Sequence, residues 1–180
     1  MINGQRGKLA LFKLDDKSGS IDGRVDEALL NANKNLFKED ELIIVMGKIQ
    51  PDRFSGGIQL TVTQVWDLEQ ARCRFGKYLK VEVHATQAAK VPHIGKLLKD
   101  FPAKKEVTEQ GELWRGLMVR LAVVRDKSAT VSSSQLDEAD NIGAAAEIQL
   151  GEVARFYPSD AALASWRSQA HQGQAAIVYD

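Results

Sequence analysis

The chain has 180 residues and equal numbers of basic and acidic side chains, 24 of each, so its formal net charge at pH 7 is zero. This balance excludes a protein that binds nucleic acid through bulk positive charge alone. With one cysteine (Cys73), no apolar run near the roughly 18 residues of a membrane helix and no secretion signal, we expect a cytoplasmic protein without disulfides or membrane contact.

The first part of the chain alternates strand and turn patterns. Strands are expected over 8–14 and 20–25, and Asp26 then caps a helix that runs to about Phe37. Two further strands, over 42–49 and from residue 58, flank a loop rich in turn-forming residues at 51–57. Gly47 inside the earlier of these strands indicates a bulge or bend. A helix with Leu68, Ala71 and Phe75 on its apolar face follows.

This order of elements predicts an incomplete OB-fold barrel over residues 1–76. A complete OB barrel has three strands, a helix and two more strands. Here the first strand is predicted to be missing, because the six residues before Gly7 are too few and too polar to supply it. Unpaired strand edges recruit other chains, so we expect self-association through the open barrel edge.

Residues 77–180 predict a small α+β domain with mostly antiparallel pairing. Strands are expected over 78–83 and 117–124, and a helix over 92–101 follows Pro92. A polar loop covers Ser128–Asn141, and a hairpin is expected from 145–150 and 153–157 around Gly151. A last helix starting at Pro158-Ser159-Asp160 precedes a final strand over 174–179.

No catalytic site, metal site or cofactor site can be assembled from the sequence. Asp15-Asp16 is a tempting pair for metal chemistry, but adjacent residues in a strand face opposite sides and Asp before Ser-Gly is ordinary turn chemistry. His84, His93 and His171 are scattered without ligand spacing. We therefore expect no catalytic, metal-binding or cofactor-binding residue, and no enzyme activity from this chain alone.

Several segments occur in the order found in the OB domain of the bacterial replicative polymerase, the DNA polymerase III alpha subunit, which the chain resembles. They are Gly7-Lys8, Phe12-Lys-Leu-Asp-Asp-Lys-Ser-Gly-Ser-Ile, Leu42-Ile-Ile-Val-Met-Gly-Lys-Ile, Asp52-Arg-Phe-Ser-Gly-Gly-Ile-Gln-Leu and Val65-Trp-Asp-Leu-Glu-Gln-Ala-Arg. The second half is similar to the extreme C-terminal domain of that subunit, through Ala146-Glu-Ile-Gln-Leu-Gly, Val153-Ala-Arg-Phe-Tyr-Pro-Ser-Asp and Ala176-Ile-Val-Tyr-Asp. Residues 85–141 match poorly.

The resemblance implies that the chain is the non-catalytic C-terminal region of a DNA-directed DNA polymerase, a nucleotidyltransferase whose catalytic part lies upstream. It further implies that the OB domain lies near single-stranded template. The C-terminal domain would dock the tau subunit of the clamp loader, within the polymerase III holoenzyme. The first OB strand would then belong to the preceding part of the larger chain.

Single-strand binding on OB folds needs a basic groove and aromatic platforms. The candidates are Arg6, Lys8, Phe12, Lys13, Lys17, Arg24, Lys48, Arg53 and Phe54. A solvated barrel face with Phe12 in the core explains the same residues, because this half is neutral and Asp22, Asp26 and Asp52 dilute the field. Binding to single-stranded DNA is therefore expected to be weak and sensitive to salt.

The candidate surface for tau lies on the last helix and strand. It comprises Trp166, Arg167, Ile177, Val178 and Tyr179, in which Trp, Tyr and Arg are frequent interface anchors. The alternative is that Trp166 and Ile177 belong to the core. Two other functions stay open for the whole chain: a stand-alone OB protein that binds single-stranded nucleic acid, and an OB module that binds a tRNA anticodon.

Overall fold

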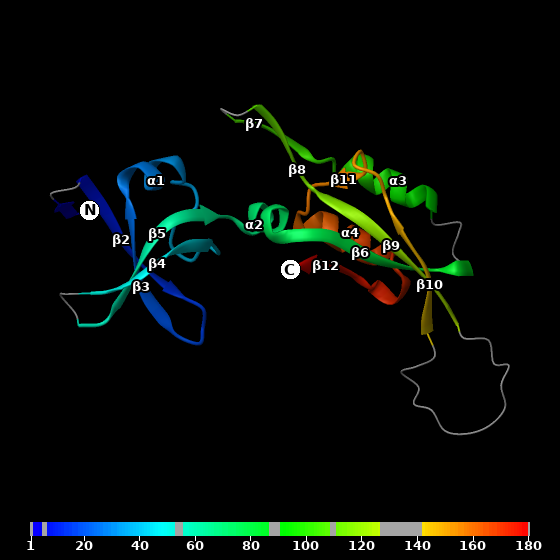
Figure 1. The fold of residues 1–180 in the computed structure, drawn as a ribbon, viewed down its shortest axis with the longest axis horizontal. Coiled ribbons are helices and arrows are strands. Elements are labelled where there is room, and N and C mark those ends of the chain that lie inside the picture. The colour runs from blue at the N-terminus through cyan, green and yellow to red at the C-terminus, as the bar shows by residue number, and fades with distance from the viewer. Residues whose placement is uncertain are drawn as a thin grey trace, which may run out of the picture. The chain divides into compact units, whose positions relative to one another are not determined.

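The computed structural model describes residues 2–4, 7–52, 56–86, 91–108, 111–126 and 142–179, which form two compact units, Met1–Leu68 and Glu69–Asp180 (Figure 1). The division falls earlier than the boundary expected after Gly76. The reason is that Arg72 donates to the carbonyl oxygen of Pro158 at 3.0 Å and pairs with Asp160 at 2.7 Å, which ties its helix to the second unit.

The first unit is a five-stranded sheet with one helix between its third and fourth strands. Its elements are β1 (Ile2–Gly4), β2 (Gly7–Asp15), β3 (Ser20–Asp26), α1 (Glu27–Ala32), β4 (Ile44–Pro51) and β5 (Ile58–Trp66). The strand order is β1-β2-β3-β5-β4, with β3 and β5 parallel and the other neighbours antiparallel. This is the OB-fold order.

The expected incomplete barrel is confirmed, since β1 and β4 do not pair within the described residues and the sheet stays open there. The prediction that the first strand is missing needs one correction. Residues Ile2–Gly4 form a short strand that pairs with Gly7–Leu9 of β2. Too few residues take part for this strand to reach across to β4.

Helix α1 begins where the sequence predicts and ends earlier. The Asp26 side chain accepts a hydrogen bond from the backbone N–H of Leu29 at 2.8 Å, which confirms the cap. The helix ends at Ala32 instead of Phe37, because the following segment is rich in Asn, a weak helix former. Phe37 still packs inward, edge-on against Phe12 with ring centroids 5.3 Å apart.

Gly47 marks a bulge, as predicted. The register between β4 and β5 shifts between Met46 and Gly47. A Cβ atom at Gly47 would lie 2.1 Å from the backbone oxygen of Thr61, so only glycine fits there. The register shift lets β5 bury both Val62 and Val65, which are an odd number of positions apart; Val25 and Leu36 of the same unit are buried as well.

The second unit contains a five-stranded sheet with two helices packed on one face, and a separate two-stranded sheet. Its elements are α2 (Leu68–Phe75), β6 (Gly76–His84), α3 (Val91–Asp100), β7 (Lys104–Thr108), β8 (Gly111–Arg115), β9 (Leu117–Asp126), β10 (Ile142–Gln149), β11 (Arg155–Phe156), α4 (Asp160–Gln169), the 3-10 helix η3 (His171–Gly173) and β12 (Ala175–Tyr179). The order is β10-β9-β6-β12. Strands β6 and β9 are parallel, joined by a crossover that contains α3, while β10 and β12 run antiparallel to their neighbours.

Side chains of β6 alternate between the core and the opposite face of the sheet. Leu79, Val81 and Val83 are buried in the core, as predicted. They share one hydrophobic cluster with residues of α3 and α4, among them Trp166, which packs against Phe156 with ring centroids 5.5 Å apart. Such a cluster holds the helices on the sheet.

Three features of the second unit differ from expectation. The segments 145–150 and 153–157 do not pair with each other, because β10 and β11 both pair with β9. The polar hairpin β7–β8 was not predicted. Phe75, placed on the apolar face of α2, is 44% exposed.

The loop predicted at Ser128–Asn141 lies outside the described residues. Among the described helices, none has the length and apolar character needed to cross a bilayer.

Candidate functional site

The candidate site in the first unit is the outer face of its sheet, built from two rows of side chains across four strands. One row joins Leu11 of β2, Arg24 of β3, Thr61 of β5 and Lys48 of β4 by direct register. The next row consists of Lys13, Asp22, Gln59 and Gln50 in the same strand order. Because side chains alternate across a strand, both rows lie on one face, opposite the buried Val25.

Arg24 is held in a fixed position at the centre of this face. Its Nε donates to Thr61 Oγ1 at 2.7 Å, and its Nη2 donates to Gln50 Oε1 at 2.9 Å. Arginine has five N–H donors in a planar fork, so both N–H groups of Nη1 remain for a ligand. Lys13 and Lys48 are exposed in the flanking positions. The face therefore presents a pre-oriented guanidinium between two exposed lysines.

Two residues beside Arg24 and Lys13 change the character of this basic face: Asp22 reduces its positive charge and Leu11 adds apolar surface. The carboxylate residue Asp22 lies directly opposite Lys13 in the register, which offsets part of the positive field. Leu11, opposite Arg24, is 53% exposed and offers an apolar surface beside the guanidinium. Sequence patterns alone did not select Leu11, Gln50 or Thr61. The pairing register of the strands was the missing signal, since it is what brings them beside Arg24.

The structure brings together three of the predicted nucleic-acid-binding residues, namely Lys13, Arg24 and Lys48. Phe12 lies on the opposite face, where its ring packs against Gly23 and Phe37, which fits the alternative that Phe12 belongs to the core. Lys17 lies in the turn at the hairpin tip, away from the two rows. Arg6, Arg53 and Phe54 lie outside the described residues, as does the side chain of Lys8.

The Asp15-Asp16 pair forms a turn, which confirms the simpler interpretation. Asp15 Oδ1 accepts from the backbone N–H of Lys17 at 2.7 Å. Asp16 Oδ1 accepts from the hydroxyl and backbone N–H of Ser18 and from the N–H of Gly19. The Ser18 hydroxyl, followed by these backbone donors, lowers the pKa of Asp16 below its ordinary value. Both carboxylates serve the turn between β2 and β3.

Histidines and carboxylates do not assemble a metal centre in the described part of the chain. No group of three or more His, Cys, Asp or Glu residues there could hold an ion. His84 and His171 are far apart in sequence and were not predicted to be neighbours, yet their rings lie together with centroids 5.2 Å apart. His84 Nδ1 is 2.8 Å from the hydroxyl of Thr86, which accounts for one ring nitrogen of this pair.

The predicted partner surface on the last helix and strand is divided by burial. Trp166 is 0% exposed and belongs to the core, so it cannot contact a partner in this structure. Ile177 packs against the same core. Tyr179 is 51% exposed, and Arg167 is exposed while its Nε donates to the carbonyl oxygen of Ala175 at 3.3 Å. The accessible part of the surface is therefore Arg167, Val178 and Tyr179.

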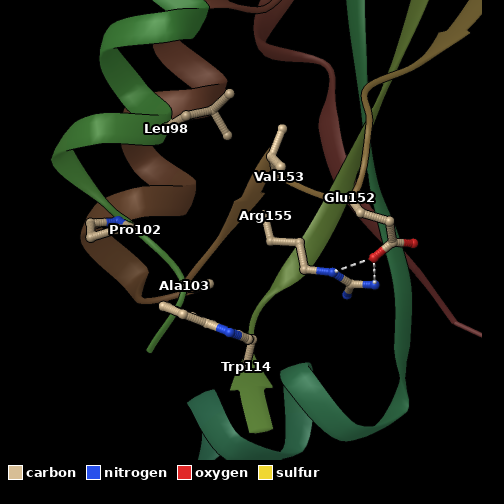
Figure 2. Close-up of a pocket in the computed structure, with 7 residues that line it drawn as sticks. All are labelled: Leu98, Pro102, Ala103, Trp114, Glu152, Val153 and Arg155. Carbon is tan, nitrogen blue, oxygen red and sulfur yellow. Dashed lines mark hydrogen bonds and ion pairs between the residues drawn. The ribbon is translucent and has the colours of Figure 1, made fainter. Parts of the chain in front are cut away.

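A groove of about 840 Å³ opens elsewhere in the second unit (Figure 2). Its lining residues come from α3, the segment before β7, β8 and the turn before β11; they are Leu98, Pro102, Ala103, Trp114, Glu152, Val153 and Arg155. Arg155 Nε and Nη2 donate to Glu152 Oε2 at 3.1 and 2.7 Å, and Nη1 donates to the carbonyl oxygen of Gly116 at 3.1 Å. The volume is in the usual range of ligand pockets, about 300–1,000 Å³.

Comparison with known proteins relates the first unit to an OB-fold family model. Residues 2–68 match the family model "tRNA_anti-codon: OB-fold nucleic acid binding domain". No solved structure matches the chain significantly.

Among curated proteins, the chain is similar to DNA polymerase III subunit alpha from several bacteria. It is 34% identical to the Pseudomonas aeruginosa protein over 85 residues, which is 47% of this chain and 7% of that protein. It is 28% identical to the Pseudomonas fluorescens protein over 129 residues, or 64% of this chain and 11% of that protein. The Pasteurella multocida protein is 34% identical over 74 residues, 41% of this chain and 6% of its own length.

The chain thus resembles the OB region of the polymerase III alpha subunit and spans only a small part of the length of these relatives.

Proposed function

We propose that the first unit binds single-stranded DNA on the outer face of β2, β3, β5 and β4, as a non-catalytic part of a replicative DNA polymerase in the cytoplasm. The observation that supports this most directly is Arg24, fixed by Thr61 and Gln50 between two exposed lysines on the face of an OB-type domain. A guanidinium held in place loses little entropy when it meets a phosphate.

The neighbouring groups favour an unpaired strand over a duplex. Amide side chains of Gln50 and Gln59 and the apolar surface of Leu11 lie beside the basic residues, and exposed base edges and faces offer contacts for both kinds of group. Asp22 reduces the positive field, so the affinity is weak and falls steeply with salt.

The test is fluorescence anisotropy with labelled oligothymidylate of about 16 nucleotides, the upper end of the site size of an OB domain. Arg24→Ala and Lys48→Ala should each weaken binding and lower the salt dependence of log K by about 0.7 per lost phosphate contact. Arg24→Lys keeps the charge and should keep the salt dependence. Lys17→Ala, at the hairpin tip, is the matched control and should bind as the parent does.

Equal losses from Lys17→Ala and Arg24→Ala would contradict a site on this face. A matching single-stranded RNA addresses the second candidate function, an anticodon-binding OB module, which the description of the family model favours. Tighter binding of the RNA than of the DNA, through the same residues, would support that candidate instead.

We further propose that the second unit docks the tau subunit of the clamp loader through Arg167, Val178 and Tyr179, with Ile177 supporting the strand from the core side. This rests on the exposed Tyr179 of β12 and the exposed Arg167 of α4, because tyrosine and arginine are frequent interface anchors. Through tau, the chain would join the rest of the polymerase III holoenzyme.

Calorimetric titration with the C-terminal domain of tau from the same source tests this docking surface. Tyr179→Ala should weaken binding by about tenfold, the effect of removing one well-placed anchor. Trp114→Ala removes an aromatic side chain of similar exposure, 57% against 51%, from a different surface and should leave tau binding unchanged. If Trp114→Ala weakened tau binding and Tyr179→Ala did not, the docking surface would not lie on the last strand.

The open sheet of the first unit supports a third proposal, which is self-association through the edge of β4. In the described residues β4 pairs only with β5, and its other edge has no strand beside it. Sedimentation velocity over a concentration series measures this association.

A further inference from the structure

The outer edge of β12 lacks the features with which natural sheet edges prevent pairing with other chains. β12 ends the sheet order β10-β9-β6-β12, so among the described strands it has a neighbour on one side only (Figure 1). Natural edges usually carry charged residues, prolines or bulges. The strand Ala175–Tyr179 contains no charged residue and no proline, and its register shift lies at its very end, between Val178 and Tyr179. This edge is therefore suited to receive a further strand.

The hydrogen bonds between β12 and β6 identify the backbone groups that face this edge. The backbone N–H of Glu82 donates to the carbonyl oxygen of Gln174 at 2.9 Å. This bond lies just outside the pair of Ala175 with Val81, which is therefore a non-hydrogen-bonded pair. Because the two kinds of pair alternate along an antiparallel ladder, the N–H and C=O groups of Ala175 and Ile177 point away from β6. Neither group of Ile177 has a hydrogen-bond partner among the described residues.

Arg167 of α4 places a guanidinium directly beside this edge. Its Nε donates to the carbonyl oxygen of Ala175 at 3.3 Å, which is one of the groups that the ladder directs outward. The side chain is exposed, and among the described residues its Nη1 and Nη2 make no hydrogen bond or ion pair. The edge thus combines an unpaired backbone donor and acceptor at Ile177 with an unneutralised positive charge two residues earlier in the strand.

We propose that the edge of β12 binds an extended segment of a partner protein as an antiparallel strand, and that an Asp or Glu side chain of this segment pairs with Arg167. The segment residue opposite Ile177 exchanges two backbone hydrogen bonds with it. Two residues later the segment lies opposite Ala175, about 4.8 Å from β12. Its side chain there falls on the face that α4 covers, from which Arg167 reaches the edge. The inference rests on the docking surface proposed above and specifies how that surface recognises its partner.

The opposite face of the sheet determines a second feature of the segment. Ile177 packs against the core, so the next side chain, Val178, lies on the other face, where it pairs in register with Tyr78. Both are half-buried, and the guanidinium of Arg120 lies over the Tyr78 ring at 3.9 Å. The segment residue that precedes the one opposite Ile177 lies beside Val178, where an apolar side chain extends this row. The expected pattern is an apolar residue, any two residues, and then Asp or Glu.

The same strand of a second copy does not supply this pattern. Pairing with Ile177 requires a residue whose own backbone groups face the edge, and before its register shift β12 offers only Ala175 and Ile177. Two residues after Ile177 stands Tyr179, and two residues after Ala175 stands Ile177, so neither register brings a carboxylate to Arg167. Charge complementarity with Arg167 therefore favours a different protein as the occupant.

The test begins with selection of a random peptide library displayed on phage against the full chain, with counter-selection on the Arg167→Glu variant. The expected consensus has an apolar residue followed three positions later by Asp or Glu. N-methylation of the peptide residue directly after the apolar one removes the N–H that donates to Ile177, and should weaken binding about tenfold. N-methylation of the next residue, whose N–H faces away from β12, is the matched control and should leave the affinity unchanged.

Amide hydrogen exchange measured by NMR locates the bound peptide. The Ile177 N–H should exchange rapidly in the free chain and at least about tenfold more slowly with peptide bound. The N–H groups of Ala176 and Val178, which point toward β6, should be protected in both states. Arg167→Glu should weaken binding at least about tenfold, and a peptide with Lys in place of the acidic residue should recover it. Arg125→Glu, at another exposed arginine on β9, is the control and should bind the peptide as the parent does.

Other outcomes overturn the proposal. They are an absence of peptides that prefer the parent to Arg167→Glu, a consensus without an acidic residue, equal losses from the two N-methylations, and an Ile177 amide whose exchange the peptide leaves unchanged. A peptide copied from residues 174–179 that binds as tightly as the selected ones would assign the edge to a second copy instead.

Titration with the C-terminal domain of tau separates this inference from the proposed function. If tau binds and Tyr179→Ala weakens it, but the Ile177 N–H still exchanges rapidly in the complex, the docking surface stands and the added strand is rejected. If the selected peptides protect Ile177 in a chain that does not bind tau, the added strand stands and tau is rejected as the partner.

Discussion

At the scale of single residues, glycine in β3 decides where an aromatic ring lies. A Cβ atom at Gly23 would come within 2.6 Å of Phe12 Cζ and 2.8 Å of Phe12 Cε2. The ring thus occupies the space that any side chain at position 23 would need. This is why Phe12 packs inward and Arg24, the next residue on β3, faces the outer side.

Gly23→Ala should therefore destabilise the first unit, even though alanine usually suits a strand better than glycine. Alanine lowers the conformational entropy of the unfolded chain, which would stabilise the fold by about 0.4–1 kcal/mol. Overpacking of its Cβ atom against the Phe12 ring costs about 1–3 kcal/mol, which is the larger effect. Urea unfolding measures the net loss. Phe12→Leu in the same background should recover part of it, and a Gly23→Ala variant as stable as the parent would show that the ring moves aside freely.

Packing in the structure favours the core for two aromatic residues, Phe12 and Trp166, for which the sequence left both the core and a contact surface open. Both residues lie on the apolar face that the hydrophobic periodicity of their strand or helix predicts. The periodicity identifies that face but does not tell whether the core or a partner protein covers it. Gly23 opposite Phe12, and Phe156 beside Trp166, are what hold the rings inside. These partners are distant in sequence or across a strand pair, so local pattern could not identify them.

At the scale of elements, one edge of β4 has no neighbouring strand among the described residues and can pair with a strand of another chain. Apolar Met46 and Ile49 on this strand are 47% and 64% exposed, and Lys48 is its only charged residue. Natural edge strands avoid pairing with other chains by carrying charges, prolines or bulges. Here the bulge at Gly47 and the single lysine give limited protection.

We expect the chain to form a concentration-dependent dimer in sedimentation velocity through antiparallel pairing of two β4 edges. Ile49→Lys places a second charge on the edge and should shift the protein to monomer. Ile148→Lys on β10, at a side chain that is also exposed, is the control and should leave the dimer intact. A parent chain that is monomeric at every concentration would contradict this prediction.

Elements with strong periodicity or clear caps were predicted correctly from sequence. The alternation of β5 and β6 and the segment around Pro158-Ser159-Asp160 are examples; Ser159 Oγ accepts from the N–H of Ala162 at 3.2 Å and caps α4. The ribbon β7–β8 was missed because its strands are short and polar and pair only with each other in the described sheet. The wrong hairpin from β10 and β11 arose because adjacency in sequence suggested pairing, while β9 is long enough to bind both.

At the scale of the whole chain, each unit has its own core and its own candidate surface. The core cluster with Leu79, Phe156 and Trp166 contains only residues of the second unit. The resemblance to polymerase III alpha, predicted from ordered motifs, is confirmed by the similarity to bacterial relatives. The sequence could not predict which residues of the basic face lie together. Their neighbourhood depends on the parallel pairing of β3 with β5, which are far apart in the chain.

The position of β12 has a consequence for how the chain folds as it is synthesised. The last strand, Ala175–Tyr179, pairs with β6, the first strand of the second unit, so the edge of that sheet is completed only by residues made some hundred positions later. The first unit has all its strands once Trp66 has left the ribosome. Even after β9 has paired with β6, the other edge of β6 stays unpaired until Tyr179 emerges, and an unpaired strand edge exposes a nascent chain to aggregation.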